Sequence, residues 1–78
     1  MMHEIKIRPE YYEAVLEGKK KFELRFDDRK YAEGDVVKLM EYDGGKFTGR
    51  CKTVEIAYVL RNVEQYGLSK EYCIFGWR

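Results

Sequence analysis

A mainly β fold of the α+β class is predicted, a small barrel of five to six mostly antiparallel strands with one helix near the N-terminus. Three observations favour it: short stretches that alternate apolar and polar residues, one early segment with a helical repeat, and glycine-containing turns between the stretches. With 78 residues, the chain is expected to form a single domain, residues 1–78, around one modest core.

The N-terminal part is predicted to form a strand and then a helix. Residues 3–8 alternate apolar and charged side chains, as a half-buried strand does. Pro9 suits the first turn of a helix, because its missing N–H would have no partner there, and the helix is expected to run to Glu17. Gly18 should cap it, since a left-handed backbone is easiest without a Cβ. An apolar stripe should cover the barrel, made of Tyr11, Tyr12, Val15 and Leu16.

The later strands are predicted from alternation and from turn residues. Residues 22–26 place Phe22, Leu24 and Phe26 on one face and leave a polar face with charges of both signs. Further strands are expected over 36–42, from Phe47 after the Gly44-Gly45 turn, over 53–60 and over 72–77. The 53–60 strand should carry one shared apolar face, made of Val54, Ile56, Tyr58 and Leu60. Residues 61–70 are expected to be a loop with one helical turn, and the last strand should seal the barrel against the first.

Charge and cysteine content narrow the function classes. The net charge is only +1, but residues 18–30 hold six basic and three acidic side chains, so positive charge gathers beside Gly18. No apolar run is long enough to span a membrane and no secretory signal is visible, so a cytoplasmic protein without a membrane partner is expected. Cys51 and Cys73 lack metal-ligand spacing and are expected to be buried thiols; no metal site and no cofactor are predicted.

The charged segment resembles a known family motif. Gly-Lys-Lys-Lys-Phe-Glu-Leu-Arg at residues 18–25 matches the G-x-K-x-x-E-x-R signature of ASCH domains, a branch of the PUA-like superfamily. The match lies where a helix cap meets a strand, as it does in that family. The preceding helix, the Gly34-Asp35 turn and residues 65–68 also resemble a small ASCH-like family of bacteria and phages. The resemblance covers nearly the whole chain and implies a PUA-like barrel with an RNA-binding cleft between the helix and the motif strand.

The first functional hypothesis is an RNA- or nucleotide-binding module. The resemblance selects Lys20, Glu23 and Arg25, whereas strand alternation groups Lys21 with the last two, so it stays open which lysine lines the cleft. Tyr31 follows the charged turn and is expected to be an exposed stacking surface. A plain alternative is a solvated charged face with ordinary ion pairs. The full candidate set for ligand binding is Gly18, Lys20, Lys21, Glu23, Arg25, Arg29, Lys30 and Tyr31.

Two other hypotheses remain. Related small ASCH proteins include amidohydrolases of acylated cytidine nucleosides, in which the motif lysine, a threonine three residues on and a distant glutamate are implicated in catalysis. This chain has Glu23 in the place of that threonine. In an enzyme, Lys20, Glu23 and Glu55 would be the catalytic residues. The third hypothesis is an accessory protein that binds another protein through its barrel. A monomer is expected, with RNA, a nucleotide or a nucleoside as its partner.

Overall fold

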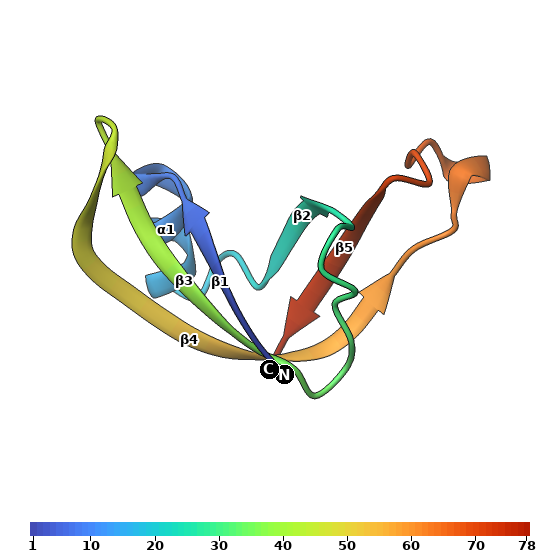
Figure 1. Ribbon diagram of the computed structural model, residues 1–78, viewed down its shortest axis with the longest axis horizontal. Coiled ribbons are helices and arrows are strands. Elements are labelled where there is room, and N and C mark those ends of the chain that lie inside the picture. Colours follow the sequence, from blue (N-terminus) through green and yellow to red (C-terminus); the bar gives the residue numbers. More distant parts are fainter.

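A five-stranded mixed sheet and one helix make up the fold in the computed structural model, which describes residues 1–78 (Figure 1). The sheet has the order β1-β3-β4-β5-β2; β1 and β3 are parallel, and the other neighbours are antiparallel. The predicted mainly β fold with one early helix is confirmed. The elements are β1 (Met2–Ile7), α1 (Pro9–Leu16), β2 (Phe22–Phe26), β3 (Val36–Asp43), β4 (Lys46–Leu60), a single 3₁₀ turn (Glu64–Tyr66) and β5 (Tyr72–Trp77).

The sheet does not close into a barrel, which corrects the prediction. β5 was expected to seal against β1, but it lies between β4 and β2, so both of its edges are already occupied. β1 pairs only with β3 and β2 only with β5, so each keeps one unpaired edge. The long strand β4 runs through both arms of a V-shaped molecule: β1, β3 and α1 lie in one arm, β2 and β5 in the other (Figure 1).

The core lies on the inner side of the sheet. It combines Ile5 and Ile7 of β1, Val37 and Leu39 of β3, and residues from β4 and β5, the last including Phe75. Helix α1 packs against β3 and buries Tyr12 and Val15, while Tyr11 and Leu16 stay about half exposed. The expected apolar stripe is therefore only half buried, because residues three apart, rather than both pairs four apart, face the sheet.

Two strands present a different face to the core than alternation predicted. β4 carries a register shift between Ile56 and Tyr58, so Ile56 is buried whereas Tyr58 and Leu60 point to the other side of the sheet. One extra residue inverts every side chain that follows it, and no feature of the sequence marks this position.

In β2 the polar residues face inward. Glu23 is opposite Phe75 and Arg25 is opposite Cys73, both of which are buried, so Glu23 and Arg25 share the core side of the sheet. The apolar residues of β2 are about half exposed on the outer side, namely Phe22, Leu24 and Phe26. The neighbouring strand decides the face here, since paired residues in a sheet point the same way.

Of the two cysteines, Cys73 is buried as predicted, but Cys51 is exposed, because it lies in the projecting β3–β4 hairpin beyond the core. No helix of the structure is both long enough and apolar enough to cross a membrane.

Candidate functional site

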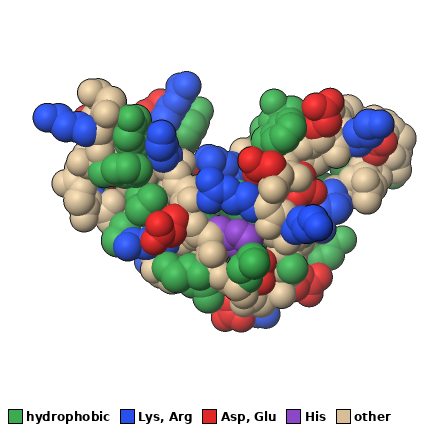
Figure 2. Space-filling view, in the orientation of Figure 1, with side chains coloured by type: hydrophobic (Ala, Val, Ile, Leu, Met, Phe, Trp, Pro, Cys, Tyr) green, Lys and Arg blue, Asp and Glu red, His purple; other side chains and the backbone are tan.

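A cleft of about 490 Å³ lies between the unpaired edges of β1 and β2. Residues from three segments form it: the end of β1, the first turn of α1, and the motif segment that leads into β2. Figure 2 shows a notch between the two arms of the V, with Lys and Arg side chains gathered at its centre. The lining consists of Lys6, Ile7, Arg8, Tyr11, Lys20, Phe22, Glu23, Leu24 and Arg25.

The helix cap sets the position of the motif lysine. Gly18 has a φ of +75°, the left-handed conformation that was predicted for it. The backbone N–H groups of Lys19 and Lys20 then donate to the carbonyl oxygen of Ala14, at 3.0 and 3.1 Å. These bonds hold the chain against the end of α1, so Lys20 begins at the wall of the cleft rather than on the regular strand.

Lys20 and Glu23 form an ion pair at the base of the cleft. Their side chains are only 15% and 8% exposed, and Lys20 Nζ pairs with Glu23 Oε1. The ammonium group also donates to the carbonyl oxygen of Phe22 at 2.7 Å and lies 5.4 and 5.1 Å from the ring centres of Tyr11 and Phe22. Arg25 Nη1 lies 3.6 Å from Glu23 Oε2, so the one carboxylate in the cleft lies between two cations.

These cations also cover the two open strand edges. Trp77 N donates to Lys21 O and Asp27 N donates to Glu71 O, so Lys21 and Asp27 face β5. Backbone groups alternate in direction along a strand, which turns those of Phe22, Leu24 and Phe26 towards the open edge. Lys20 donates to the carbonyl of Phe22 there.

Arginines from the β2 side reach the edge of β1 in the same way. Arg25 Nη1 donates to Lys6 O at 3.1 Å, and Arg29 Nη1 donates to Glu4 O at 2.5 Å. Unpaired carbonyl groups at a sheet edge need donors, and these side chains supply them. Cationic side chains therefore bridge the gap that a backbone ladder would close in a barrel.

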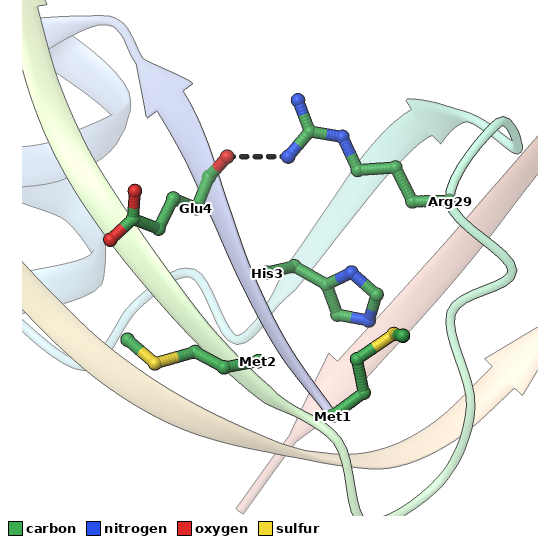
Figure 3. Close-up of a pocket in the computed structure, with 5 residues that line it drawn as sticks. All are labelled: Met1, Met2, His3, Glu4 and Arg29. Atoms are coloured by element: carbon green, nitrogen blue, oxygen red, sulfur yellow. Dashed lines mark hydrogen bonds between the residues drawn. The ribbon is translucent and has the colours of Figure 1, made fainter.

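A second, more open hollow of about 520 Å³ continues along β1 beyond the arginine bridge (Figure 3). In Figure 3, Arg29 reaches from the loop after β2 to the carbonyl of Glu4, and the His3 ring lies below it. His3 Nε2 is 2.8 Å from Asp35 Oδ2, and this hydrogen bond is the main cause of the lowered pKa of Asp35. The hollow is lined by Met1, Met2, His3, Glu4 and Arg29.

The structure brings together the three residues that the motif selects. Lys20, Glu23 and Arg25 all line the cleft, and Lys20 rather than Lys21 occupies it; Lys21 is exposed outside. Gly18 acts through the helix cap and does not line the cleft.

The remaining candidates lie elsewhere. Arg29 lines the second hollow, and the exposed Lys30 lines neither. Glu55 is on β4 opposite Val36, exposed and outside both hollows, so it does not join Lys20 and Glu23.

Tyr31 is a core residue, which corrects its predicted exposure. It is 2% exposed, and its ring centre lies 4.7 Å from those of both His3 and Phe75. Arg61 donates to its carbonyl oxygen at 2.8 Å and to both carboxylate oxygens of Asp27, which folds the 27–35 loop back over the sheet. The Tyr31 ring is therefore part of the core on the inner side of the sheet and is not available for stacking with a base.

Sequence reasoning missed the β1 side of the cleft. Lys6 lies on the exposed face of β1 and Arg8 follows the strand as the N-cap residue of α1; nothing in their local pattern distinguishes them from solvated charges. β1 and β2 are at opposite ends of the sheet, and only the bend of the sheet brings these side chains near the motif (Figure 1). No group of three or more His, Cys, Asp or Glu side chains lies together in a way that could hold a metal ion.

The fold and the cleft define a small mainly β domain with one helix and a polar, cation-rich cleft between open strand edges. The chain belongs to the family described as a domain of unknown function, DUF3850, whose model matches residues 2–77. It is also similar to a protein of Escherichia phage P2 described as "Uncharacterized 12.9 kDa protein in GpA 3'region", with 49% identity over 49 residues. That alignment covers 63% of this chain and 45% of the phage protein, so the chain spans less than half the length of this relative.

Proposed function

We propose that the cleft between β1 and β2 binds a nucleotide, either free or as one unit of RNA. The observation that carries this proposal is the lining itself: four cationic side chains, one carboxylate and two half-exposed aromatic rings around about 490 Å³. Ligand pockets in proteins commonly measure about 300–1,000 Å³, so the cleft has room for a base with its sugar and phosphate.

Each part of the lining suits one part of a nucleotide. Arg8 is exposed at the rim, where a phosphate can be neutralised without losing all its hydration. Lys6 is also exposed, and its ammonium lies 4.4 Å from the ring centre of Tyr42, so it adds positive charge near the rim. The rings of Tyr11 and Phe22 offer stacking surfaces, which contribute about 1–3 kcal/mol per stacked base. Glu23 is the one side-chain carboxylate of the lining and would accept from the amino group of a base.

The motif resemblance supports the same proposal. The ASCH signature selects Lys20, Glu23 and Arg25, and these three residues meet in the cleft. We propose on this ground that the chain is an open variant of the PUA-like barrel, in which cationic bridges replace the missing pairing of β1 with β2.

Binding of RNA should be weak and dependent on salt. With about three phosphate contacts and a slope of roughly −0.7 per contact, affinity should fall ~20-fold between about 50 and 200 mM salt. Specificity would then depend on stacking and on base contacts inside the cleft rather than on the phosphate backbone.

The test is fluorescence anisotropy of a labelled RNA pentamer with wild type, Arg8→Gln and Arg78→Gln. Arg8 lines the cleft and makes no side-chain cap to α1, whereas Arg78 is an exposed arginine outside it, so the two changes are matched in charge. We expect Arg8→Gln to weaken binding about 5- to 10-fold and Arg78→Gln less than about 2-fold. Equal losses in both variants, or no binding at millimolar protein, would exclude the cleft as the site.

The buried Lys20–Glu23 pair favours one second candidate, hydrolysis of an acylated cytidine. Water would replace the amine, releasing a carboxylic acid and the free cytidine, with Lys20 holding the oxyanion and Glu23 transferring the proton. Incubation with an acylated cytidine and detection of the released acid distinguishes the two candidates. Turnover that disappears in Lys20→Met and survives in Glu55→Gln would establish the hydrolase. Binding of the acylated cytidine without turnover would instead support the non-catalytic binding module.

A further inference from the structure

The outer face of the β4-β5-β2 half of the sheet is apolar and uncovered. Strand register places three rows side by side there: Tyr58 with Gly76 and Phe22, Leu60 with Ile74 and Leu24, and Tyr72 with Phe26. Six of these side chains are between 37% and 60% exposed, namely Phe22, Leu24, Phe26, Tyr58, Leu60 and Tyr72.

The three rows themselves contain no charged side chain. The three rows hold seven apolar side chains and one glycine, because the register shift in β4 turns Tyr58 and Leu60 to the same side as the apolar residues of β2. Phe26 and Tyr72 pack edge to face, with ring centres 5.6 Å apart; Ile74 is half-buried, and Phe22, Leu24, Tyr58 and Leu60 are exposed. Lys20, beside Phe22 at one end of the face, is the cation nearest to these rows, so the face offers far more apolar area to a protein surface than positive charge to a phosphate backbone.

The exposed area of the outer face fits the requirement of a modest dimer. An aromatic side chain buries roughly 150–250 Å² when fully covered, so the four half-exposed rings and two leucines offer roughly 500 Å² per copy. Two copies would bury about 1,000 Å² in total, the lower limit for a specific interface. On a lone monomer, a patch of this size is at the upper end of what is usual.

We infer that two copies of the chain pack through this outer face, sheet on sheet about a two-fold axis. A two-fold contact brings the same patch against itself, so three strands that present apolar rows can pack against the same rows of a second copy. The net charge of +1 gives little repulsion between copies. This dimer would replace the monomer expected from sequence. It does not require that the cleft bind a nucleotide, but Phe22 and Leu24 belong both to the outer face and to the lining of the cleft.

Sedimentation equilibrium over about 5–500 µM protein tests the inference. For an interface near 1,000 Å², wild type should move from 9.4 kDa towards twice that mass within this range. Leu60→Lys should stay at the monomer mass throughout, with a dissociation constant raised at least about 100-fold, since it places a lysine in the middle row of each apolar patch. Leu16→Lys on α1 makes the same change at a similarly exposed leucine outside the face and should leave association unchanged.

Two results of these experiments would overturn the inferred dimer. Wild type that stays monomeric over the range overturns the inference, even if RNA or another protein is then found to shift the amides of the outer face. So does a dimer that Leu60→Lys leaves intact. If Leu60→Lys does not give a folded amide spectrum, Tyr58→Lys, with Tyr66→Lys as its exposed-tyrosine control, gives the same readout.

Discussion

Lys20 and Glu23 form an ion pair that is largely shielded from solvent, and each charge is compensated by the other. The lysine has the carboxylate, the carbonyl of Phe22 and two aromatic rings around it, and the carboxylate has a second cation in Arg25. Desolvation of either charge alone would cost several kcal/mol, so the pair is stable only as a pair.

Removal of one partner of this pair should therefore destabilise the fold. We expect Glu23→Ala to lower the free energy of unfolding by about 2–4 kcal/mol, because it leaves the Lys20 ammonium poorly solvated without its carboxylate. Replacing both residues, Lys20→Met with Glu23→Ala, should cost at least about 1 kcal/mol less than the sum of the single changes. Urea denaturation of the four proteins gives this coupling directly. Strict additivity would show that the pair does not interact.

The two cysteines should differ sharply in reactivity. Burial, aided by the nearby charge of Asp27, raises the pKa of Cys73 to about 11, so its thiolate is scarce at pH 8. Cys51 is exposed on β4. An aromatic disulfide reagent at pH 8 should modify one thiol quickly in the native protein and the second only in denaturant. Cys51→Ser should lose the fast phase, and a fast phase that persists in this variant would contradict the burial of Cys73.

Motif spacing grouped Lys20, Glu23 and Arg25 without any knowledge of strand pairing, and the three residues do lie together in the cleft. Tyr31 shows the opposite case. Its position after a charged turn suggested exposure, but the loop folds back over the sheet through Arg61, a residue thirty positions away. Local sequence carries no sign of such a distant hydrogen bond.

Among the elements, the junction between α1 and β2 depends on one backbone conformation. Gly18 has a positive φ, and a Cβ built there meets no atom within 4 Å, so only backbone strain opposes substitution. Gly18→Ala should cost about 1 kcal/mol, and Gly18→Asn less, because asparagine tolerates the left-handed region better. Thermal or urea unfolding of both variants measures this order. An alanine variant as stable as wild type would show that the cap is not left-handed in solution.

The 27–35 loop should make stability depend on pH in the acid range. The hydrogen bond from Arg61 lowers the pKa of Asp27, and that from His3 lowers the pKa of Asp35. A carboxyl group whose folded pKa lies below its unfolded value of about 3.9 stabilises the fold above that pH, and the contribution is lost as pH falls through the folded pKa.

The free energy of unfolding should therefore be lower at pH 3 than at pH 6. Urea titrations at both pH values measure the difference for wild type and for Asp27→Asn. The variant should be less stable at pH 6 by about 1 kcal/mol. Its free energy of unfolding should also fall less between pH 6 and pH 3, since only Asp35 of these two carboxyl groups remains to be protonated. A variant with the full wild-type pH dependence would rule out the Asp27–Arg61 bond as a source.

The helix and most strands could be placed from sequence because alternation and helical repeat are local properties, but the two strands expected from Phe47 and over 53–60 are one continuous strand, β4. The inward face of β2 and the outer face of β4 beyond Ile56 could not be predicted from sequence. The first follows from pairing with Cys73 and Phe75, about fifty residues away, and the second from a single-residue register shift. Alternation gives two faces but does not say which one a neighbour will cover.

Taken as one body, the molecule is a bent sheet whose two end strands face each other across a cleft and do not pair. Its inner side holds the core and the cationic bridges, and its outer side carries the apolar face of β2, β4 and β5. Barrel closure was predicted because closure removes open edges; here Arg25, Arg29 and Lys20 cover the edge carbonyls instead. Because side chains bridge β1 and β2 in place of backbone hydrogen bonds, a cleft remains between the two strands.

A map of backbone amide shifts on adding cytidine monophosphate or adenosine monophosphate would decide whether this cleft is a nucleotide site. Saturable changes should occur in residues 6–8 and 22–25, the two unpaired edges, while Tyr58 and Tyr72 on the outer face stay unmoved. Saturable changes centred elsewhere, or none at millimolar nucleotide, would contradict the proposed site.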